Sequence, residues 1–327
     1  MKQLIFKILA VSLVLAASLS AGAQTCQGKD EIPEPARKAI ENAAQQAFDQ
    51  SASGDVNSLK TNTIPSLQSN FSGIAGAVSD NKDAFPGAKA QIRSVYLLDT
   101  GANPGPDGVF YCGIFGANGM NPSTAEFDLP GLPVGKYAIS IQDFIGNKGP
   151  YSLTLIFQDM SGWKMAGYHI SPGTSVGHDG LWYLQQARDY KSKGQVHNAW
   201  FYYLTSWELL APVSFMNTKM LSKITDESNS VQPKDVPVGG KPVAFSAGGK
   251  SYNITDMSLF RTDKNFDLAV KYSVPSTADF NGTQADARNL ANALIAQYPE
   301  LKDGFNNIWV HAIDANGGDV VGLVKLK

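Results

Sequence analysis

The sequence contains few histidines and almost no excess charge of either sign. It has four histidines in 327 residues and a formal net charge of −2. Proteins that bind nucleic acid need a basic face, so this charge balance excludes nucleic acid as a partner. No two histidines stand three or four residues apart, the spacing that places two metal ligands on one face of a helix. We therefore expect no cofactor and no metal, with a metal held by His169 and His178 as the alternative.

Long apolar runs are also scarce, and the one that occurs is at the N-terminus. Lys2 and Lys7 precede a mostly apolar run from Ile8 to Leu19, and Ala21-Gly22-Ala23 follows it. The run is shorter than the roughly 20 apolar residues of a transmembrane helix, and this order of features is typical of a cleaved secretory signal peptide. We predict that residues 1–23 are removed on export to the periplasm or the cell exterior, which leaves a mature chain without a membrane span.

Cysteine is limited to one pair, Cys26 and Cys112. An isolated pair in an oxidising compartment usually forms a disulfide, so we predict this bridge, with two free thiols as the alternative. The bridge would close a long loop, which the chain-entropy model values at about 4–5 kcal/mol.

The rest of the chain divides into zones of different hydrophobic period. Residues 34–80 carry a helical apolar stripe that includes Ile40 and Phe48, and Ser53-Gly54-Asp55 predicts the end of one helix and the start of another. Further along, the period changes to two, which predicts strands at 92–98, 109–115, 124–129, 137–141, 151–157 and 163–170. Short connectors favour an antiparallel meander, and helices followed by such a sheet predict an α+β fold.

Three motifs in this region resemble those of a known family. They are Ser53-Gly54-Asp55, the segment Leu132-Pro133-Val134-Gly135-Lys136-Tyr137, and Gly162-Trp163-Lys164-Met165-Ala166-Gly167-Tyr168-His169-Ile170. Together they are similar to exported bacterial proteins with the nuclear transport factor two-like fold, over about residues 34–171. The resemblance implies a cone-shaped α+β domain at 24–172, in which a bent sheet wraps a helix and leaves a pocket. No catalytic residue of the family transfers, because the chain shows no matching acid–base set.

Residues 173–227 are predicted to form a helical hairpin. Six small and aromatic residues resemble the spacing of a single tetratricopeptide unit, namely Ala187, Tyr190, Gly194, Ala199, Tyr203 and Ser206. We expect the hairpin to pack on the preceding sheet. Its dense aromatic side chains favour a packed core over an exposed ligand platform.

A polar segment with two prolines, residues 228–241, predicts a linker. The region 242–327 is predicted as a small α+β domain with a strand at 266–274, a helix that starts at a capping box of Thr283 and Asp286, and a terminal hairpin. Asp314 to Asp319 has the start of a calcium loop but lacks an oxygen at its fifth position and Glu at its twelfth. A hairpin turn is therefore expected there.

The segment Leu97-Leu98-Asp99-Thr100-Gly101-Ala102 resembles the catalytic triplet of aspartic proteases, in which two carboxylates share a proton. The chain has no second Asp-Thr-Gly or Asp-Ser-Gly, so Asp99 would act only in a homodimer. The turn-rich segment from Asn103 to Gly108 departs from the family. A strand that ends in a turn explains the motif better.

The segment Gly173-Thr174-Ser175-Val176-Gly177 matches the nucleophile elbow of serine hydrolases. That elbow belongs to a parallel sheet, whereas this sheet is predicted to be antiparallel. A catalytic triad would also need Asp267 and His311 from beyond the linker. A glycine-rich connector is the favoured interpretation.

These observations favour an exported, non-enzymatic protein that binds a ligand or a protein partner. A small apolar or amphipathic ligand would lie in the cone, in a pocket whose candidate lining residues are Tyr137, Trp163, Tyr168 and His169. A protein partner would bind the hairpin. The alternative function is an exported hydrolase, either a dimeric aspartic protease through Asp99 or a serine esterase through Ser175.

Overall fold

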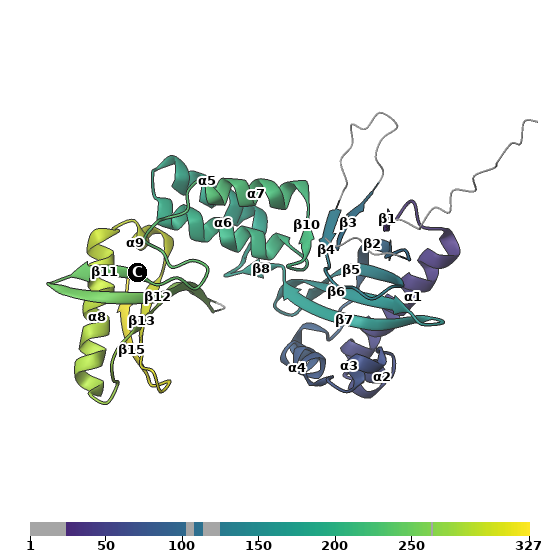
Figure 1. Cartoon of the computed structure of the whole chain (residues 1–327), viewed down its shortest axis with the longest axis horizontal. Coiled ribbons are helices and arrows are strands. Elements are labelled where there is room, and N and C mark those ends of the chain that lie inside the picture. Colours follow the sequence, from purple (N-terminus) through teal and green to yellow (C-terminus); the bar gives the residue numbers. More distant parts are fainter. Residues whose placement is uncertain (1–23, 103–107, 114–124, 263) are drawn as a thin grey trace, which may run out of the picture.

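The computed structural model describes residues 24–102, 108–113, 125–262 and 264–327. The predicted signal peptide lies outside this range. The fold is mixed α+β, as predicted, with an N-terminal sheet, a group of helices and a C-terminal sheet in chain order (Figure 1).

A five-stranded antiparallel sheet forms the centre of the N-terminal part. Its strands, in spatial order, are β1 (Thr25–Gly28), β2 (Gln91–Asp99), β5 (Lys136–Gly146), β6 (Gly149–Asp159) and β7 (Trp163–Pro172). The strands predicted at 92–98, 137–141, 151–157 and 163–170 are confirmed. The N-terminal strand β1 was not predicted, because its four residues show no alternation.

Helices cover one face of this sheet. They are α1 (Glu34–Ser53), α2 (Val56–Thr61), α3 (Pro65–Gln68), α4 (Ser72–Asp80) and the 3-10 turn η1 (Lys82–Ala84). Gly54 ends α1 in the left-handed conformation that favours glycine, and the Asp55 side chain caps α2 by accepting a hydrogen bond from the Ser58 amide. The predicted helix break at this motif is therefore confirmed. Ile40, Ala44 and Phe48 of α1 are buried against the sheet.

The opposite face of the sheet is covered by a second, three-stranded sheet. It consists of β3 (Val109–Cys112), β4 (Ala125–Asp128) and β10 (Met216–Asn217). This arrangement corrects the predicted meander, because β2 pairs with β5 and not with β3. The physical reason lies in β5, which is buried on both faces and needs a cover on each.

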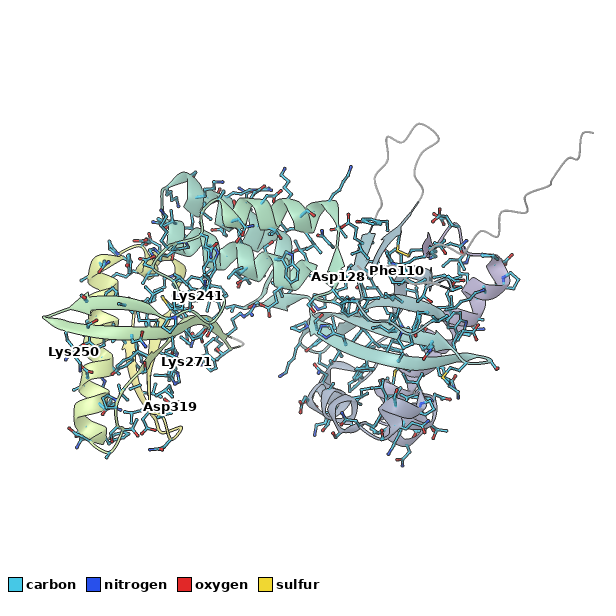
Figure 2. All side chains as sticks on the ribbon, viewed as in Figure 1. Phe110, Asp128, Lys241, Lys250, Lys271 and Asp319 are labelled. Carbon is cyan, nitrogen blue, oxygen red and sulfur yellow. A yellow bond between two sulfur atoms is a disulfide. The ribbon has the colours of Figure 1, made fainter. Side chains whose placement is uncertain are left out.

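The disulfide between Cys26 and Cys112 is confirmed, and it joins β1 to β3 with Cα atoms 4.7 Å apart. Phe110 and Phe127 lie on the same inward face of the small sheet. They are buried in the core between the two sheets, which we call the second core. Figure 2 labels Phe110 and Asp128 on this sheet, which lies beside the hairpin.

The middle of the chain is helical, as predicted. A short ribbon of β8 (Thr174–Ser175) and β9 (His178–Asp179) leads into α5 (Gly180–Ser192), which α6 (Val196–Leu210) and α7 (Lys219–Asn229) follow. α5 and α6 pack closely, and the Ser206 hydroxyl donates a 2.8 Å hydrogen bond to the Gly180 carbonyl.

The C-terminal sheet has five strands in chain order. They are β11 (Val243–Ala247), β12 (Lys250–Arg261), β13 (Phe266–Ser273), β14 (Asn307–Ile313) and β15 (Asp319–Lys325). β13 and β14 are parallel and are connected through α8 (Phe280–Gln297) and α9 (Leu301–Gly304), whereas the other neighbours are antiparallel. α8 starts at Phe280 with Asp279 as its N-cap, a few residues before the predicted capping box.

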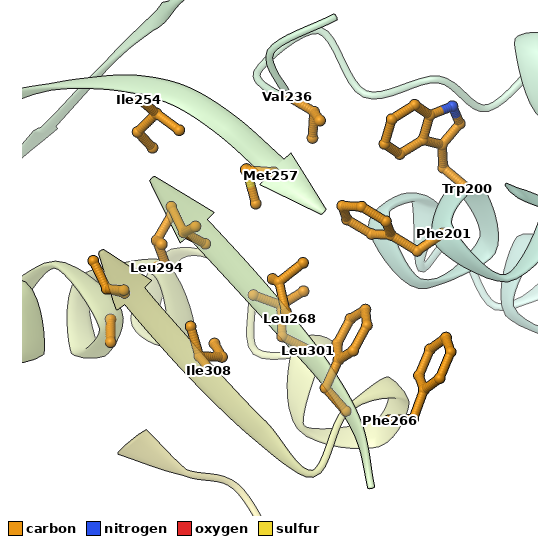
Figure 3. Close-up of a cluster of buried hydrophobic side chains, with 14 of the residues drawn as sticks. Trp200, Phe201, Val236, Ile254, Met257, Phe266, Leu268, Leu294, Leu301 and Ile308 are labelled. Atoms are coloured by element: carbon orange, nitrogen blue, oxygen red, sulfur yellow. The ribbon is translucent and has the colours of Figure 1, made fainter. Parts of the chain in front are cut away.

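One continuous core joins the hairpin to the C-terminal sheet, and Figure 3 shows Phe201 of α6 and Phe266 of β13 within it. Phe201 packs edge-on against Phe305 at 5.8 Å, and Phe305 stacks on Phe266. The predicted packing of the hairpin on the preceding sheet therefore differs from the structure. α6 is buried almost continuously from His197 to Tyr203, and a helix buried around its circumference requires a neighbour on each side. Within the segment predicted as a linker, Val231 and Val236 are buried in this same core.

Candidate functional site

The four candidate pocket residues lie on different sides of the N-terminal sheet. Trp163 and Tyr168 pack on the side that α1 covers, whereas Tyr137 packs into the second core on the opposite side. His169 is exposed on β7 and follows Tyr168, so it points to the other face. The structure therefore divides the four residues into two pairs, with Trp163 and Tyr168 on the face that α1 covers and Tyr137 and His169 on the opposite face.

Burial determines the chemistry of the two tyrosines. It raises the pKa of Tyr168 to about 12, although the Ser51 hydroxyl lowers this pKa in part. Burial also raises the pKa of Tyr137, whose hydroxyl donates a 3.0 Å hydrogen bond to the Pro133 carbonyl. Both phenols therefore stay neutral near pH 7 and contribute to packing.

Aromatic rings occupy much of the space between α1 and the sheet. Phe144 stacks on Phe85 and on Tyr151 with ring centroids 5.4 Å apart in each case. Phe48 of α1 meets Phe144 edge-on at 5.2 Å. This cluster packs the helix onto β5 and β6.

Asp99 lies at the end of β2, where its carboxylate accepts a 2.9 Å hydrogen bond from the Gly101 amide. The neighbouring Thr100 is fully buried, and its hydroxyl accepts a hydrogen bond from the Gly135 amide at 2.8 Å. The triplet therefore forms a turn that is fastened to the start of β5, which matches the favoured interpretation of the motif.

Ser175 lies at the entry of a two-residue turn. Val176 and Gly177 both have positive φ angles, 50° and 78°, which is the signature of a hairpin turn, and Ser175 pairs with His178 across it. The His178 ring stacks on Trp182 at 3.7 Å, and no described group bonds to the Ser175 hydroxyl.

The acid and base that an esterase would need are engaged elsewhere. Asp267 accepts hydrogen bonds from Asn307 and Trp309, each at 2.9 Å, and His311 lies 3.0 Å from Asp319. The structure thus shows no hydrogen-bonded triad of Ser175, Asp267 and His311 among the residues it describes.

One cluster of ionisable groups was not foreseen, and it centres on His197. The ring is 5% exposed, with Nδ1 2.9 Å from Glu300 and Nε2 3.1 Å from Asp235. Since the two carboxylates lie at opposite edges of the ring, a metal ion at either nitrogen would meet only one of them. The two contacts instead join α6 to the segment before β11, through Asp235, and to the start of α9, through Glu300. In the described part of the chain, no group of three His, Cys, Asp or Glu residues is arranged to hold a metal.

A cavity of about 770 Å³ lies between the small sheet and the helices α6 and α7. We call it the acidic cleft. Strand alternation explains its composition, because Tyr111 of β3 pairs with Glu126 of β4, and Glu126 pairs with Asn217 of β10. These side chains share the outer face of the small sheet, opposite to Phe110 and Phe127.

Three carboxylates and three aromatic side chains dominate the acidic cleft. The carboxylates are Glu126 and Asp128 of β4 and Asp226 of α7, and none of them forms an ion pair with a described residue. The aromatic residues are Tyr111, Trp207 and Phe215, and the Tyr111 side chain is 55% exposed. No lysine, arginine or histidine is among the described residues that line it.

Comparison with family models, with curated proteins and with solved structures finds no match for this chain. Among the described helices, none is long and apolar enough to cross a membrane.

Part of the acidic cleft could be predicted from the sequence. Ala125-Glu126-Phe127-Asp128 alternates perfectly, which predicts a strand with both acids on one face. The contribution of Trp207 of α6 and Asp226 of α7 could not be predicted, because these helices meet the small sheet through β10, whose two residues pair with β4 and show no periodic pattern.

Proposed function

We propose that this is an exported, non-enzymatic binding protein and that its acidic cleft binds a small organic cation, such as an aliphatic polyamine. The observation that carries the proposal is the lining of the cleft, in which carboxylates lie beside aromatic rings and, among the described residues, neither an ion-pair partner nor a basic lining side chain competes. A cavity of about 770 Å³ has the size of a small-molecule site.

Two attractions would act on a cation in this cleft. Carboxylates on low-dielectric walls focus the field and raise the local concentration of a positively charged ligand. The faces of aromatic rings carry negative potential, and a cation placed over one gains about 0.5–2 kcal/mol. Tyr111 supplies an exposed ring directly across from Glu126.

Export and ancestry are part of the same proposal. The disulfide supports export, because such bonds persist in oxidising compartments. An antiparallel sheet with α1 across one face supports relationship to the nuclear transport factor two-like fold. The small residues between α5 and α6 support a single tetratricopeptide-like unit that could also contact a protein partner.

The test is calorimetric titration of the mature protein with spermidine. The triple variant Glu126→Gln, Asp128→Asn and Asp226→Asn should weaken binding about tenfold, because three partly exposed ion pairs contribute roughly 0.5 kcal/mol each. Raising the salt to 1 M should weaken binding to the native protein, since the screening length falls to about 3 Å.

A matched control removes the same amount of charge elsewhere. Asp30, Asp80 and Asp83 are exposed, and their change to Asn should leave spermidine affinity within about twofold of the native value. Tyr111→Ala should weaken binding several-fold, whereas Tyr111→Phe should retain it. Equal losses in the cleft variant and in the control would reduce the effect to net charge and overturn the proposal.

A further inference from the structure

A second cavity, of about 420 Å³, lies where the chain passes between the N-terminal sheet and the hairpin. We call it the hinge cleft. Two connections border it, one at Pro172 and Gly173 and the other at Ala211 and Pro212. Sites between separately folded parts of a protein are common positions for ligands.

The floor of the hinge cleft is a polar row that crosses four strands. Gln91 of β2 pairs with Asp143 of β5, Asp143 pairs with Ser152 of β6, and Ser152 pairs with Ser171 of β7. Strands lie about 4.8 Å apart, so the row extends roughly 14 Å from β2 to β7. The Ser152 hydroxyl is buried and has no hydrogen-bond partner among the described groups.

The two ends of the row differ in chemistry. Lys89 and Arg93 lie at the β2 end, where Arg93 is 3.5 Å from Asp143 and Lys89 has no ion pair with a described residue. The other acid in the lining, Asp179, accepts a hydrogen bond from the Trp182 amide and caps α5. Lys89 is therefore available to an anion.

The wall toward the hairpin is apolar. Leu181 of α5 and Leu209 and Leu210 of α6 line it, and the Leu181 side chain is 52% exposed. Ile145 of β5, at the rim, is 71% exposed. Removing such apolar surface from water favours binding of an apolar chain.

From this polarity we infer that the hinge cleft binds an amphipathic carboxylate of medium chain length, with its head group at Lys89 and its chain against Leu181 and Leu209. Ser152 lies on β6, two strands from the β2 end of the floor, beside the path of the chain and not at the head group. This site is separate from the acidic cleft and takes a ligand of the opposite charge.

Decanoate, used below its micelle concentration, is the probe, and decanol is the neutral comparison. Calorimetry on the mature protein should show decanoate binding at least tenfold more tightly than decanol. Lys89→Met should remove most of this difference, whereas Lys148→Met, at an exposed lysine on the β5–β6 turn, should preserve it. Leu181→Ser should weaken both ligands several-fold, because it removes apolar contact without removing a buried side chain.

The melting temperature of each variant establishes that it is folded. Absence of decanoate binding to the folded native protein overturns the inference, and so does binding that neither Lys89→Met nor Leu181→Ser changes. The triple variant of the acidic cleft should bind decanoate normally, which separates failure of this site from failure of the proposed cation site.

Discussion

Asp314, in the turn between β14 and β15, shows how one side chain can determine a local structure. Its carboxylate accepts hydrogen bonds from the amide and hydroxyl of Thr277 and from the amides of Asn316 and Gly318. The residue was expected to belong to a hairpin turn and not to a calcium site, and the structure confirms the turn. These hydrogen bonds lower the pKa of Asp314 from its ordinary 3.8 to about 2, and the bond from the Thr277 hydroxyl has the largest effect.

A depressed pKa in the folded state gives a stability contribution that is present above pH 3.8 and is lost as the pH falls toward 2. Asp314→Asn should therefore lower the melting temperature at pH 5 to 7, and the difference from the native protein should shrink as the pH approaches 2. Thermal melts followed by circular dichroism between pH 2 and 7 measure this. Asp80→Asn, at an exposed residue for which the structure describes no side-chain hydrogen bond, is the control. A difference that stays constant across this pH range would contradict the assignment.

At the scale of elements, the sequence predicted most strands of the N-terminal sheet but not how they pair. Alternation identifies a strand, yet it does not show that β2 skips β3 and pairs with β5. Likewise, the two motifs that resemble catalytic sites could be recognised in the sequence, but the turns that contain them could not. The turn at Asp99 depends on a hydrogen bond from the distant Gly135 amide to Thr100. The turn at Ser175 depends on the positive φ angles of Val176 and Gly177. The His197 cluster joins positions about 100 residues apart, and no local pattern encodes such a contact.

Helix α8 and strand β15 approach each other so closely that glycine is required at Gly322. A Cβ atom there would lie 2.7 Å from the Arg288 amide nitrogen and 2.8 Å from the Ala287 Cβ. Gly322→Ala should therefore destabilise the protein by about 1–3 kcal/mol, the usual cost of overpacking. In α4, a Cβ at Gly76 meets nothing within 4 Å, so Gly76→Ala should stabilise by up to about 1 kcal/mol. Urea denaturation measures the free energy of unfolding of both variants. If Gly322→Ala stabilised the protein as Gly76→Ala does, glycine would have no packing role at Gly322.

At the scale of the whole molecule, the buried side chains form three clusters, which group the elements into two units. Two clusters lie on the two faces of the N-terminal sheet, and a third combines the hairpin, residues Val231 and Val236, and the C-terminal sheet. The hinge cleft lies at the boundary of the two units. Its volume therefore depends on how they are oriented, and a ligand that contacts both would favour one orientation.

This division predicts which elements lose stability together. Phe201→Ala removes a buried ring that contacts Phe305, and such a change costs about 3–5 kcal/mol. Hydrogen exchange should accelerate in α6 and also in β13 and β14, while β5 and β6 keep their native rates. Phe144→Ala, in the cluster under α1, should give the reverse pattern. If Phe201→Ala accelerated exchange in the hairpin but left β13 unchanged, the hairpin and the C-terminal sheet would be independent units, and the hinge would lie between them instead.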